Sequence, residues 1–351
     1  MELNADVPVG LLLSGGLDSS IIVALGSRLR SKLDTFTVKF NGYSEFDESS
    51  HASLISKKFN TNHHLIDASE ISPEIIETLV EYYDEPIFDS SIIPTFLVSK
   101  AISSNCKVAL GGDGGDELFG GYPHYNKLLK YKNYFSPIPL AIRGFLSKNI
   151  QSFLPTGYKG KKSLEFFGSD FKNSYPDISE FFSFNERKAI LNSSNILISD
   201  TESIRNKEIA PLEDFIKRAT LFDYENYLKN DLLVKVDRAS MANSLEIRCP
   251  FLDKEIINFS FFEVPSKLKV QSNRRKILLK MLAKKILPKE FDYERKQGFS
   301  IPLKIFLKEK KWYDFFNEKI NSSNPDIFNK SEALDLLNSK SRLDQNAERL
   351  F

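Results

Sequence analysis

The chain has 351 residues, 41% of them hydrophobic and 12% aromatic, so it is long enough to bury a large core. A formal net charge of +1 excludes the strong basic field expected of a nucleic-acid or anionic-membrane binder, and no apolar run approaches the roughly 20 residues of a membrane helix. Two widely spaced cysteines and four histidines argue against a disulfide framework and a zinc site, and they favour a reducing, cytoplasmic setting.

The first part of the chain alternates strand and helix signals. Short apolar or alternating runs predict strands at residues 7–13, 35–40, 63–67 and 107–112. Helical spacing of apolar residues predicts helices at residues 18–30, 51–59, 72–83 and 92–103. This order predicts an α/β fold with a doubly wound, mainly parallel sheet, in which ligands bind beyond the carboxyl ends of the strands.

The pattern changes after residue 125. Residues 125–215 are aromatic, Lys-rich and broken by Pro and Gly, with helix-like pieces and no strong strand, whereas residues 216–287 read as helical. Within them, KILLKMLAKKIL predicts a helix that buries one face and is given no chemical role. We therefore expect a nucleotide-binding core at 1–125 and an extensive, mainly helical part at 126–351. That part would pack on the core, complete the active site and form one domain with it.

The sharpest chemical signal lies between the first predicted strand and helix, at Ser14-Gly15-Gly16-Leu17-Asp18-Ser19-Ser20. A helix N-terminus presents unpaired N–H groups that favour a phosphate, and glycines let the backbone approach that anion closely. The three serine hydroxyls add donors, and Asp18 suggests a bridging Mg²⁺. The alternative is an ordinary turn in which Asp18 and Ser19 cap the helix.

A second glycine-rich stretch follows the strand predicted at 107–112: Gly111-Gly112-Asp113-Gly114-Gly115-Asp116-Glu117-Leu118-Phe119-Gly120-Gly121-Tyr122. Neither stretch matches the GxxxxGK[ST] phosphate loop or the GxGxxG dinucleotide fingerprint. Acids in such loops are often solvated turn residues. If Asp18 and Asp116 converge from the two loops, however, they form an oxygen-rich Mg²⁺ site beside a pyrophosphate.

SGGxDSS is the signature of the PP-loop ATP pyrophosphatases, which are similar to adenine nucleotide alpha hydrolases in fold and cleave ATP between the α and β phosphates. Together with GGDGGDELFGGY some ninety residues later, the chain resembles the synthetase domain of class B, glutamine-dependent asparagine synthetases. FDESSHASLISKKFNTNHHLI, DEPIFDSSIIPTFLVS, YLKNDLLVKVDRASMANSLEIRCPFLD, RRKILLKMLAKKILPKEF and RKQGFSIP match as well, so the resemblance covers residues 5 to 305.

The resemblance implies a set of site residues for ATP and Mg²⁺. The pyrophosphate part of ATP would contact Ser14, Gly16, Asp18 and Ser19, with Gly15 and Ser20 in the same turn, and Asp18 with Asp116 would bind Mg²⁺. Backbone groups near Leu12, Val38 and Gly112 would hold the adenine. Arg238 falls where the family places a basic residue close to the phosphates. Lys296 matches the lysine that stabilises the departing pyrophosphate, as a cation facing developing charge should.

Asp113 marks a departure from the family pattern. Asparagine synthetases usually carry Glu at this position, near the attacking ammonia. The shorter carboxylate can still accept a proton, but it weakens the assignment of L-aspartate as the acceptor. The expected reaction is adenylation of a carboxylate, with aspartate favoured, followed by transfer of ammonia to give an amide and AMP. The alternatives are an amidotransferase or cyclase acting on a sugar acid, a peptide or a β-lactam precursor, and a non-catalytic ATP-binding assembly module.

Ammonia would come from a glutaminase domain or a partner chain. The glutaminase half of the family begins with a cysteine directly after the initiator methionine, whereas residue 2 here is Glu. We therefore expect either a fragment of a longer protein, which we favour, or a stand-alone synthetase. The sequence is compatible with a homodimer.

Overall fold

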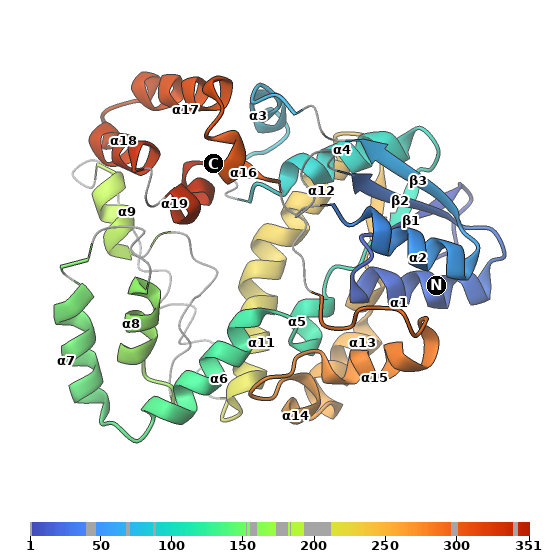
Figure 1. Ribbon diagram of the computed structural model, residues 1–351, viewed down its shortest axis with the longest axis horizontal. Helices are drawn as coiled ribbons and strands as arrows, with labels where there is room; N and C mark the ends of the chain where they lie inside the picture. Colours follow the sequence, from blue (N-terminus) through green and yellow to red (C-terminus); the bar gives the residue numbers. More distant parts are fainter. Residues whose placement is uncertain are drawn as a thin grey trace. The chain divides into compact units, whose positions relative to one another are not determined.

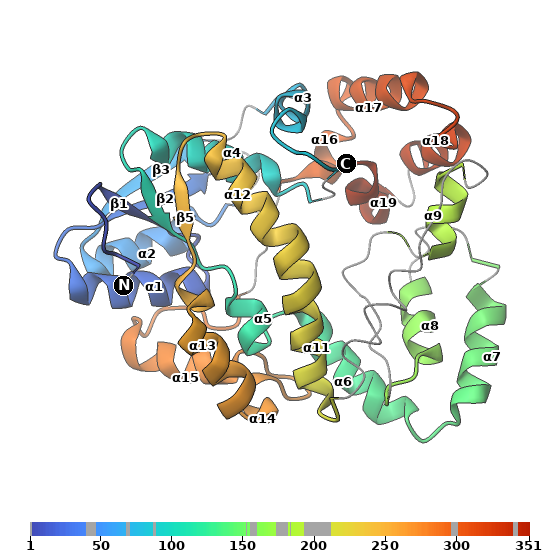
Figure 2. The same ribbon diagram turned by 180° about the vertical axis from the view of Figure 1, so that it is seen from behind.

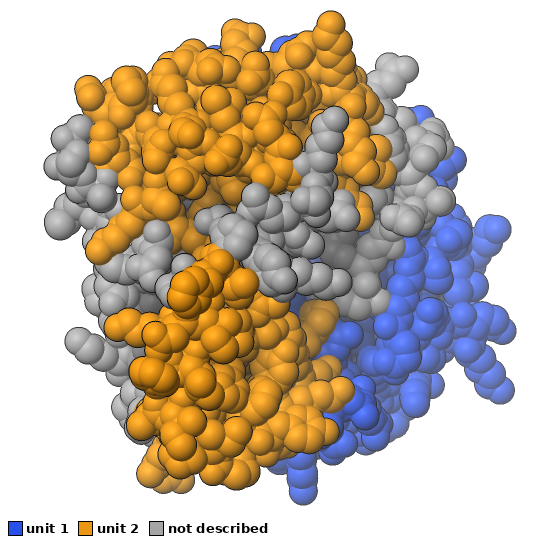
Figure 3. Space-filling view, turned by 60° about the vertical axis from the view of Figure 1, so that its left-hand side comes forward, with its two compact units in different colours: residues 1–122, 223–301 blue, residues 123–222, 302–351 orange. Residues whose placement is uncertain are grey.

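The computed structural model describes residues 2–39, 47–67, 71–86, 89–151, 153–154, 160–172, 182, 184–192, 212–295, 301–339 and 343–351. These residues divide into two compact units, coloured separately in Figure 3. Unit 1 contains residues 1–122 and 223–301, and unit 2 contains residues 123–222 and 302–351. The chain thus leaves unit 1 after Tyr122 and returns to it at Asp223.

Unit 1 is built on a five-stranded sheet with the order β3-β2-β1-β4-β5, in which every pair of neighbours is parallel. The strands are β1 (Val9–Leu12), β2 (Asp34–Lys39), β3 (Asn62–Asp67), β4 (Val108–Leu110) and β5 (Glu246–Arg248). Four of them lie where the sequence predicts strands. The parallel, doubly wound α/β fold class is therefore confirmed (Figures 1 and 2).

The fifth strand corrects the prediction that residues 216–287 are helical. β5 has only three residues and pairs with β4 in the register Val108↔Glu246 and Leu110↔Arg248. Glu246 and Arg248 also form an ion pair, with 2.7 Å between Arg248 Nε and Glu246 Oε1. A three-residue segment with charged residues at both ends carries no alternating apolar pattern, so only its pairing with β4 identifies it as a strand.

Helices cover both faces of the sheet (Figures 1 and 2). Before the excursion to unit 2 they are α1 (Leu17–Leu29), α2 (Ser49–Phe59), α3 (Ile75–Val80), α4 (Ile92–Ser103) and α5 (Gly115–Phe119). After the return, the chain forms the π-helix η1 (Tyr224–Leu232), α12 (Leu233–Met241), η2 (Pro250–Leu252), α13 (Lys254–Asn258), η3 (Phe259–Glu263), α14 (Ser266–Lys269) and α15 (Ile277–Ile286).

The core of unit 1 lies between the sheet and these helices. Leu11 of β1, Val23 of α1, Ile93 of α4 and Ala109 of β4 have no exposed surface. Such complete burial of aliphatic side chains, worth about 1.5–3 kcal/mol for each Val, Leu or Ile, fixes the central strands. The turns that follow β1 and β4 are therefore held on a rigid frame.

Unit 2 is helical in its described residues. Its helices are α6 (Pro123–Phe135), α7 (Leu140–Gln151), α8 (Lys161–Gly168), α9 (Phe184–Ile190), α11 (Phe215–Asp223, which ends at the boundary with unit 1), α16 (Leu303–Phe306), α17 (Lys310–Ser322), α18 (Lys330–Asn338) and α19 (Leu343–Leu350). Trp312 is fully buried and stacks on Phe306, with 4.9 Å between ring centroids. Aromatic residues near the C-terminal end of the chain thus form part of a core. Across the described helices of both units, none combines the length and apolar character needed to cross a membrane.

Candidate nucleotide and metal site

The first glycine turn connects β1 to the N-terminus of α1. Gly16 is the cap residue of α1, and no side chain forms a cap hydrogen bond there. The Ser19 hydroxyl donates instead to the Gly16 carbonyl over 3.3 Å and lies 3.1 Å from the Ser14 hydroxyl oxygen. The alternative in which Asp18 and Ser19 cap the helix is therefore not what the structure contains. The first amide groups of α1 remain oriented as donors for an anion.

The second glycine turn begins beside the first because β1 and β4 are neighbouring parallel strands, with Leu11 opposite Leu110. A Cβ atom at Gly115 would lie 2.7 Å from Cγ of Asp18, and one at Gly112 would lie 3.2 Å from its Cβ. Only glycines leave room for this approach. The structure thus brings Asp18 against the second turn, which also carries Asp116 in the first turn of α5.

Lys276 joins the two turns. Its ammonium group contacts the carboxylate of Asp18 and lies 2.6 Å from Oδ1 of Asp116. The lysine side chain is only 7% exposed. Burial alone would lower the pKa of Lys276, but the carboxylates of Asp116 and Asp18 raise it above its usual value, so the side chain is charged.

The sequence analysis missed Lys276. It treated KILLKMLAKKIL as an amphipathic helix, yet Lys276 precedes α15 as its cap residue and has a left-handed backbone with φ 49°. The preceding residue also contacts the second turn, because Arg275 Nη1 donates to the Gly121 carbonyl over 2.6 Å. No local signal distinguishes Lys276 from the other lysines of this segment, because its role depends on contacts with two turns that are distant in the sequence.

Glu117 follows Asp116 and is buried with 1% exposure. The Tyr122 hydroxyl donates to its carboxylate. Burial, reinforced by the nearby charge of Asp116, raises the pKa of Glu117 to about 8. The side chain is therefore largely protonated at neutral pH, which reduces the negative charge beside the carboxylates of Asp18 and Asp116.

Asp113 lies in the second turn within electrostatic range of the other charged groups. Burial raises the pKa of Asp113, Asp18 and Asp116 raise it further, and the ammonium of Lys235 lowers it. The Cys249 thiol lies 3.9 Å from Oδ2 of Asp113, as donor to acceptor. Burial and the Asp113 charge raise the pKa of the Cys249 thiol, which excludes a reactive thiolate.

A second buried polar cluster, also missed from the sequence, surrounds Lys235 of α12. Its ammonium lies 2.7 Å from Asp89 Oδ2 and 2.7 Å from the Ser91 hydroxyl. Asp231 occupies the preceding turn of the same helical stretch, four residues before Lys235. Burial, together with the charge of Asp89, raises the pKa of Asp231 to about 6. The cluster thus places one lysine among two carboxyl groups on adjacent helical segments.

Arg238, expected near the phosphates, forms an ion pair with Asp84 and is 43% exposed. Among the described residues, this is the charged partner that the structure assigns to it. Leu12 ends β1, and Val38 lies in the neighbouring strand β2, two residues beyond Phe36, which pairs with Leu12. The adenine contacts expected of them stay a prediction. Lys296 lies outside the described residues.

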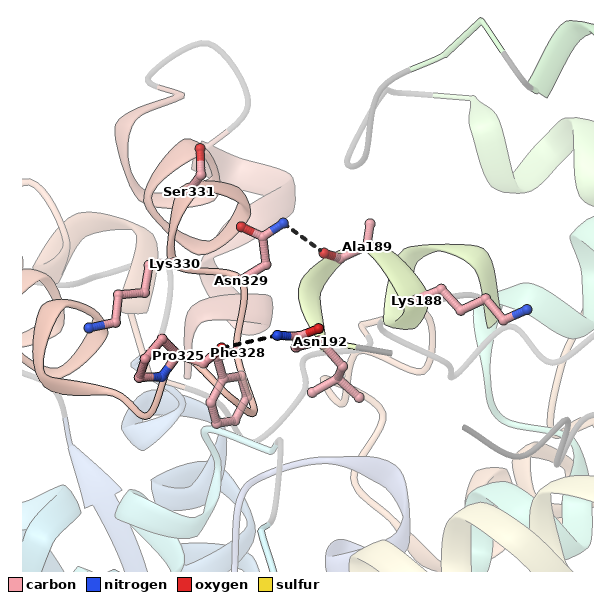
Figure 4. Close-up of a pocket in the computed structure, with 9 residues that line it drawn as sticks. Lys188, Ala189, Asn192, Pro325, Phe328, Asn329, Lys330 and Ser331 are labelled. Carbon is pink, nitrogen blue, oxygen red and sulfur yellow. Dashed lines mark hydrogen bonds between the residues drawn. The ribbon is translucent and has the colours of Figure 1, made fainter. Parts of the chain in front are cut away.

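No group of three or more metal-ligating side chains occurs in the part of the chain that the structure describes. Unit 2 contains a cavity of about 550 Å³ between α9 and α18, where Asn329 donates to the Ala189 carbonyl and Asn192 to the Pro325 carbonyl (Figure 4). Lysines, amides and apolar groups line it, and its lining residues include no carboxylate. It therefore lacks the acidic groups found at the paired glycine turns.

The parallel sheet with two glycine turns at adjacent strand ends defines an α/β domain of the PP-loop class. The sequence model of the family described as asparagine synthase matches residues 1–350, and the chain belongs to this family. It is 32% identical over 312 residues to "Asparagine synthetase [glutamine-hydrolyzing] 1" of Bacillus subtilis (strain 168), covering 88% of this chain and 48% of that protein.

A similar likeness extends to two other prokaryotic proteins. The chain is 32% identical over 327 residues to "Putative asparagine synthetase [glutamine-hydrolyzing]" of Mycobacterium tuberculosis (strain ATCC 25618 / H37Rv), covering 92% of this chain and 49% of the relative. It is 33% identical over 261 residues to "Putative asparagine synthetase [glutamine-hydrolyzing] 2" of Methanocaldococcus jannaschii, covering 72% of this chain and 48% of that relative. The chain therefore spans about half the length of the curated relatives it matches.

Proposed function

We propose that this chain is an ATP-dependent amide-forming ligase that adenylates a carboxylate, with L-aspartate the favoured acceptor. A carboxylate oxygen of the acceptor attacks the α phosphorus of ATP, the bond from that phosphorus to the bridging oxygen breaks, and pyrophosphate leaves. Ammonia then attacks the acyl carbon of the adenylate, and AMP departs with the bonding electrons. The observation that carries the proposal is the convergence of Asp18 and Asp116 beside the uncapped N-terminus of α1.

The first turn supplies donors for the triphosphate. In this proposal the amides at the start of α1 and the hydroxyls of Ser14, Ser19 and Ser20 would donate to the triphosphate at the carboxyl end of β1, with Gly15 and Gly16 forming the turn. Individual preorganised donors of this kind contribute about 2.7–4 kcal/mol to transition-state stabilisation. The roles of Lys296 with pyrophosphate and of Arg238 near the phosphates rest on the family resemblance.

The acidic pair fits Mg²⁺. Asp18 and Asp116 already converge on one cationic group, the ammonium of Lys276, so their oxygens are arranged for a single small cation. Mg²⁺ is held in proteins by one or two carboxylates together with substrate phosphates and water, which matches a pair rather than a larger ligand set. When bound there, Mg²⁺ neutralises charge on the phosphates. Glu117, held protonated by burial, adds little negative charge to the pair.

Asp113 is the proposed acceptor of the proton that ammonia loses when it attacks the adenylate. It belongs to the same turn as Asp116, and its raised pKa favours proton uptake. Ammonia would come from a glutaminase domain or a partner chain, as the printed names of the relatives suggest. The proposed setting is the cytoplasm, which is compatible with Cys106 and Cys249, both free.

A second candidate function keeps the chemistry and changes the acceptor. Asp113 is one methylene shorter than the Glu usual among asparagine synthetases, which alters the space next to the reacting carbonyl. An amidotransferase or cyclase acting on a sugar acid, a peptide or a β-lactam precursor would adenylate that carboxylate in the same way.

ATP–pyrophosphate exchange, measured with and without L-aspartate and in the presence of Mg²⁺, tests the proposal. Exchange that depends on aspartate supports the favoured acceptor. Exchange with another carboxylate but not aspartate transfers the proposal to the second candidate. No AMP formation with any acceptor in a panel of carboxylates would leave a non-catalytic ATP-binding module as the better explanation.

A further inference from the structure

Lys276 lies between Asp18 and Asp116, the two carboxylates proposed above to hold Mg²⁺. We propose that Lys276 is a built-in counterion, which balances the two carboxylates before the metal–nucleotide complex binds and is displaced from them toward the phosphates when that complex enters. This inference rests on the proposed function and makes Lys276 a positioning residue for the metal and the triphosphate.

The geometry places one cation on both carboxylates at once. The Lys276 ammonium contacts Asp18 and lies 2.6 Å from Oδ1 of Asp116, with its side chain 7% exposed. A buried pair of like charges is costly, and an ammonium between them reduces that cost. One ammonium carries a single positive charge against two negative charges, so a divalent cation matches the same oxygens better. The lysine and the metal therefore compete for one set of ligands.

The backbone around Lys276 fixes where its side chain can go. Lys276 has a left-handed φ of 49°, a conformation that costs a non-glycine residue about 1 kcal/mol or more and persists only where the surrounding structure holds it. Arg275 anchors the segment to the Gly121 carbonyl. A Cβ at Gly121 would lie 2.2 Å from Cε of Lys276, so Gly121 keeps the path of the lysine open.

Displacement requires rotation of the side chain only. The four-carbon stem of lysine has rotatable bonds throughout, while its backbone stays anchored. Asp18 lies in the first turn of α1, so an ammonium leaving that carboxylate is already at the helix N-terminus where phosphates would bind. The charge released from the carboxylates is thereby available to the triphosphate. In this exchange the carboxylates of Asp18 and Asp116 would pair with the metal, and the Lys276 ammonium would pair with the phosphates. No buried charge would lose its partner.

The test measures binding of Mn²⁺, as a probe for Mg²⁺, to the full chain without nucleotide or acceptor, using electron paramagnetic resonance. Lys276→Met removes the competing cation, and we expect it to bind Mn²⁺ at least about tenfold more tightly than the unsubstituted chain, a change of about 1.4 kcal/mol. Lys280→Met is the matched control. Lys280 lies one turn further along α15 and pairs with Glu294, 2.7 Å away. We expect it to leave Mn²⁺ affinity unchanged.

Unchanged or weaker Mn²⁺ binding by Lys276→Met overturns the inference. If Lys276→Met is too unstable without metal for the binding measurement, its melting temperature is measured with and without Mn²⁺. A larger rise than in the unsubstituted chain supports the inference, and an equal or smaller rise overturns it. Adding Asp18→Asn to Lys276→Met should abolish the gain. The Mn²⁺ measurement contains no nucleotide and is therefore independent of catalysis. If Lys276→Met binds Mn²⁺ more tightly but no carboxylate acceptor causes pyrophosphate release from ATP, only the proposed function is defeated. Pyrophosphate release without the Mn²⁺ effect defeats this inference alone.

Discussion

Among the described residues of unit 1, two lysines are buried against carboxylates, and their surroundings differ. Lys276 lies between Asp18 and Asp116, which come from two glycine turns at the ends of neighbouring strands. Lys235 instead links helix α12 to Asp89 and Ser91 at the start of α4. The first pairing joins two glycine turns at the ends of β1 and β4, whereas the second joins α12 to the residues just before α4. We therefore assign the Lys276 pairing to the proposed exchange with a metal ion and the Lys235 pairing to the stability of the fold.

We expect the largest change in stability from breaking the ion pair between Lys235 and Asp89. Lys235→Met leaves the Asp89 carboxylate buried without its ammonium partner, and breaking one half of a buried pair costs about 3–5 kcal/mol. We expect a loss of that size in the free energy of unfolding, measured by urea denaturation. Lys229→Met, at an exposed position of η1, is the control and should change stability by less than about 0.5 kcal/mol. If Lys235→Met changes the free energy of unfolding as little as Lys229→Met does, the Lys235–Asp89 pair does not stabilise the fold.

Asp18→Asn tests the proposed metal site at Asp18 and Asp116. Loss of this carboxylate removes a proposed metal ligand next to the N-terminus of α1, and we expect AMP formation to fall by about 10²–10³-fold. Asp6→Asn removes an exposed carboxylate and should keep full activity. Equal turnover by both variants would show that Asp18 has no part in holding the nucleotide.

Gly121→Ala tests how closely the turn and Lys276 are fitted. The added Cβ would lie 1.7 Å from Oδ1 of Asp116 and must displace that carboxylate, at a cost of about 1–3 kcal/mol. We expect AMP formation to decline and the melting temperature to drop. Gly144→Ala on α7 meets no atom within 4 Å and should be neutral or slightly stabilising, because alanine favours the helix. If Gly121→Ala has the same activity and melting temperature as Gly144→Ala, the close packing at Gly121 is not required for function.

The smallest expected effect is a pH dependence from the Lys235 cluster. Burial and Asp89 raise the pKa of Asp231 to about 6, while Lys235 opposes the rise and Tyr227 lies in the same electrostatic neighbourhood. A carboxyl group whose pKa is raised in the folded state stabilises the fold below its unfolded pKa and loses that contribution as pH rises through about 6. Thermal melts at pH 5 and pH 7 should therefore differ less in Asp231→Asn than in the unsubstituted chain. An identical difference would place Asp231 in a less buried environment.

Local patterns predicted much of unit 1. The helix predicted at residues 92–103 matches α4 in both bounds, and the strand predicted at 63–67 falls within β3. Such elements can be predicted because their apolar residues repeat at the period of the helix or strand that they form. β5 and the pairing of Lys276 escaped prediction for the opposite reason. A three-residue strand has no period, and a single lysine before a helix has no pattern at all.

The class of the sheet, the two glycine turns and the family were predictable from the amino-acid sequence, because strand periodicity and the unusual run of glycines and acids are local properties of the chain. Tertiary structure alone decided that residues 246–248 extend the sheet and that Lys276 reaches Asp18, 258 positions away. It also decided that Lys235 pairs with Asp89. These choices depend on which segments are brought into contact when the core is buried, and hydrophobic burial is not directional, so no local pattern encodes them.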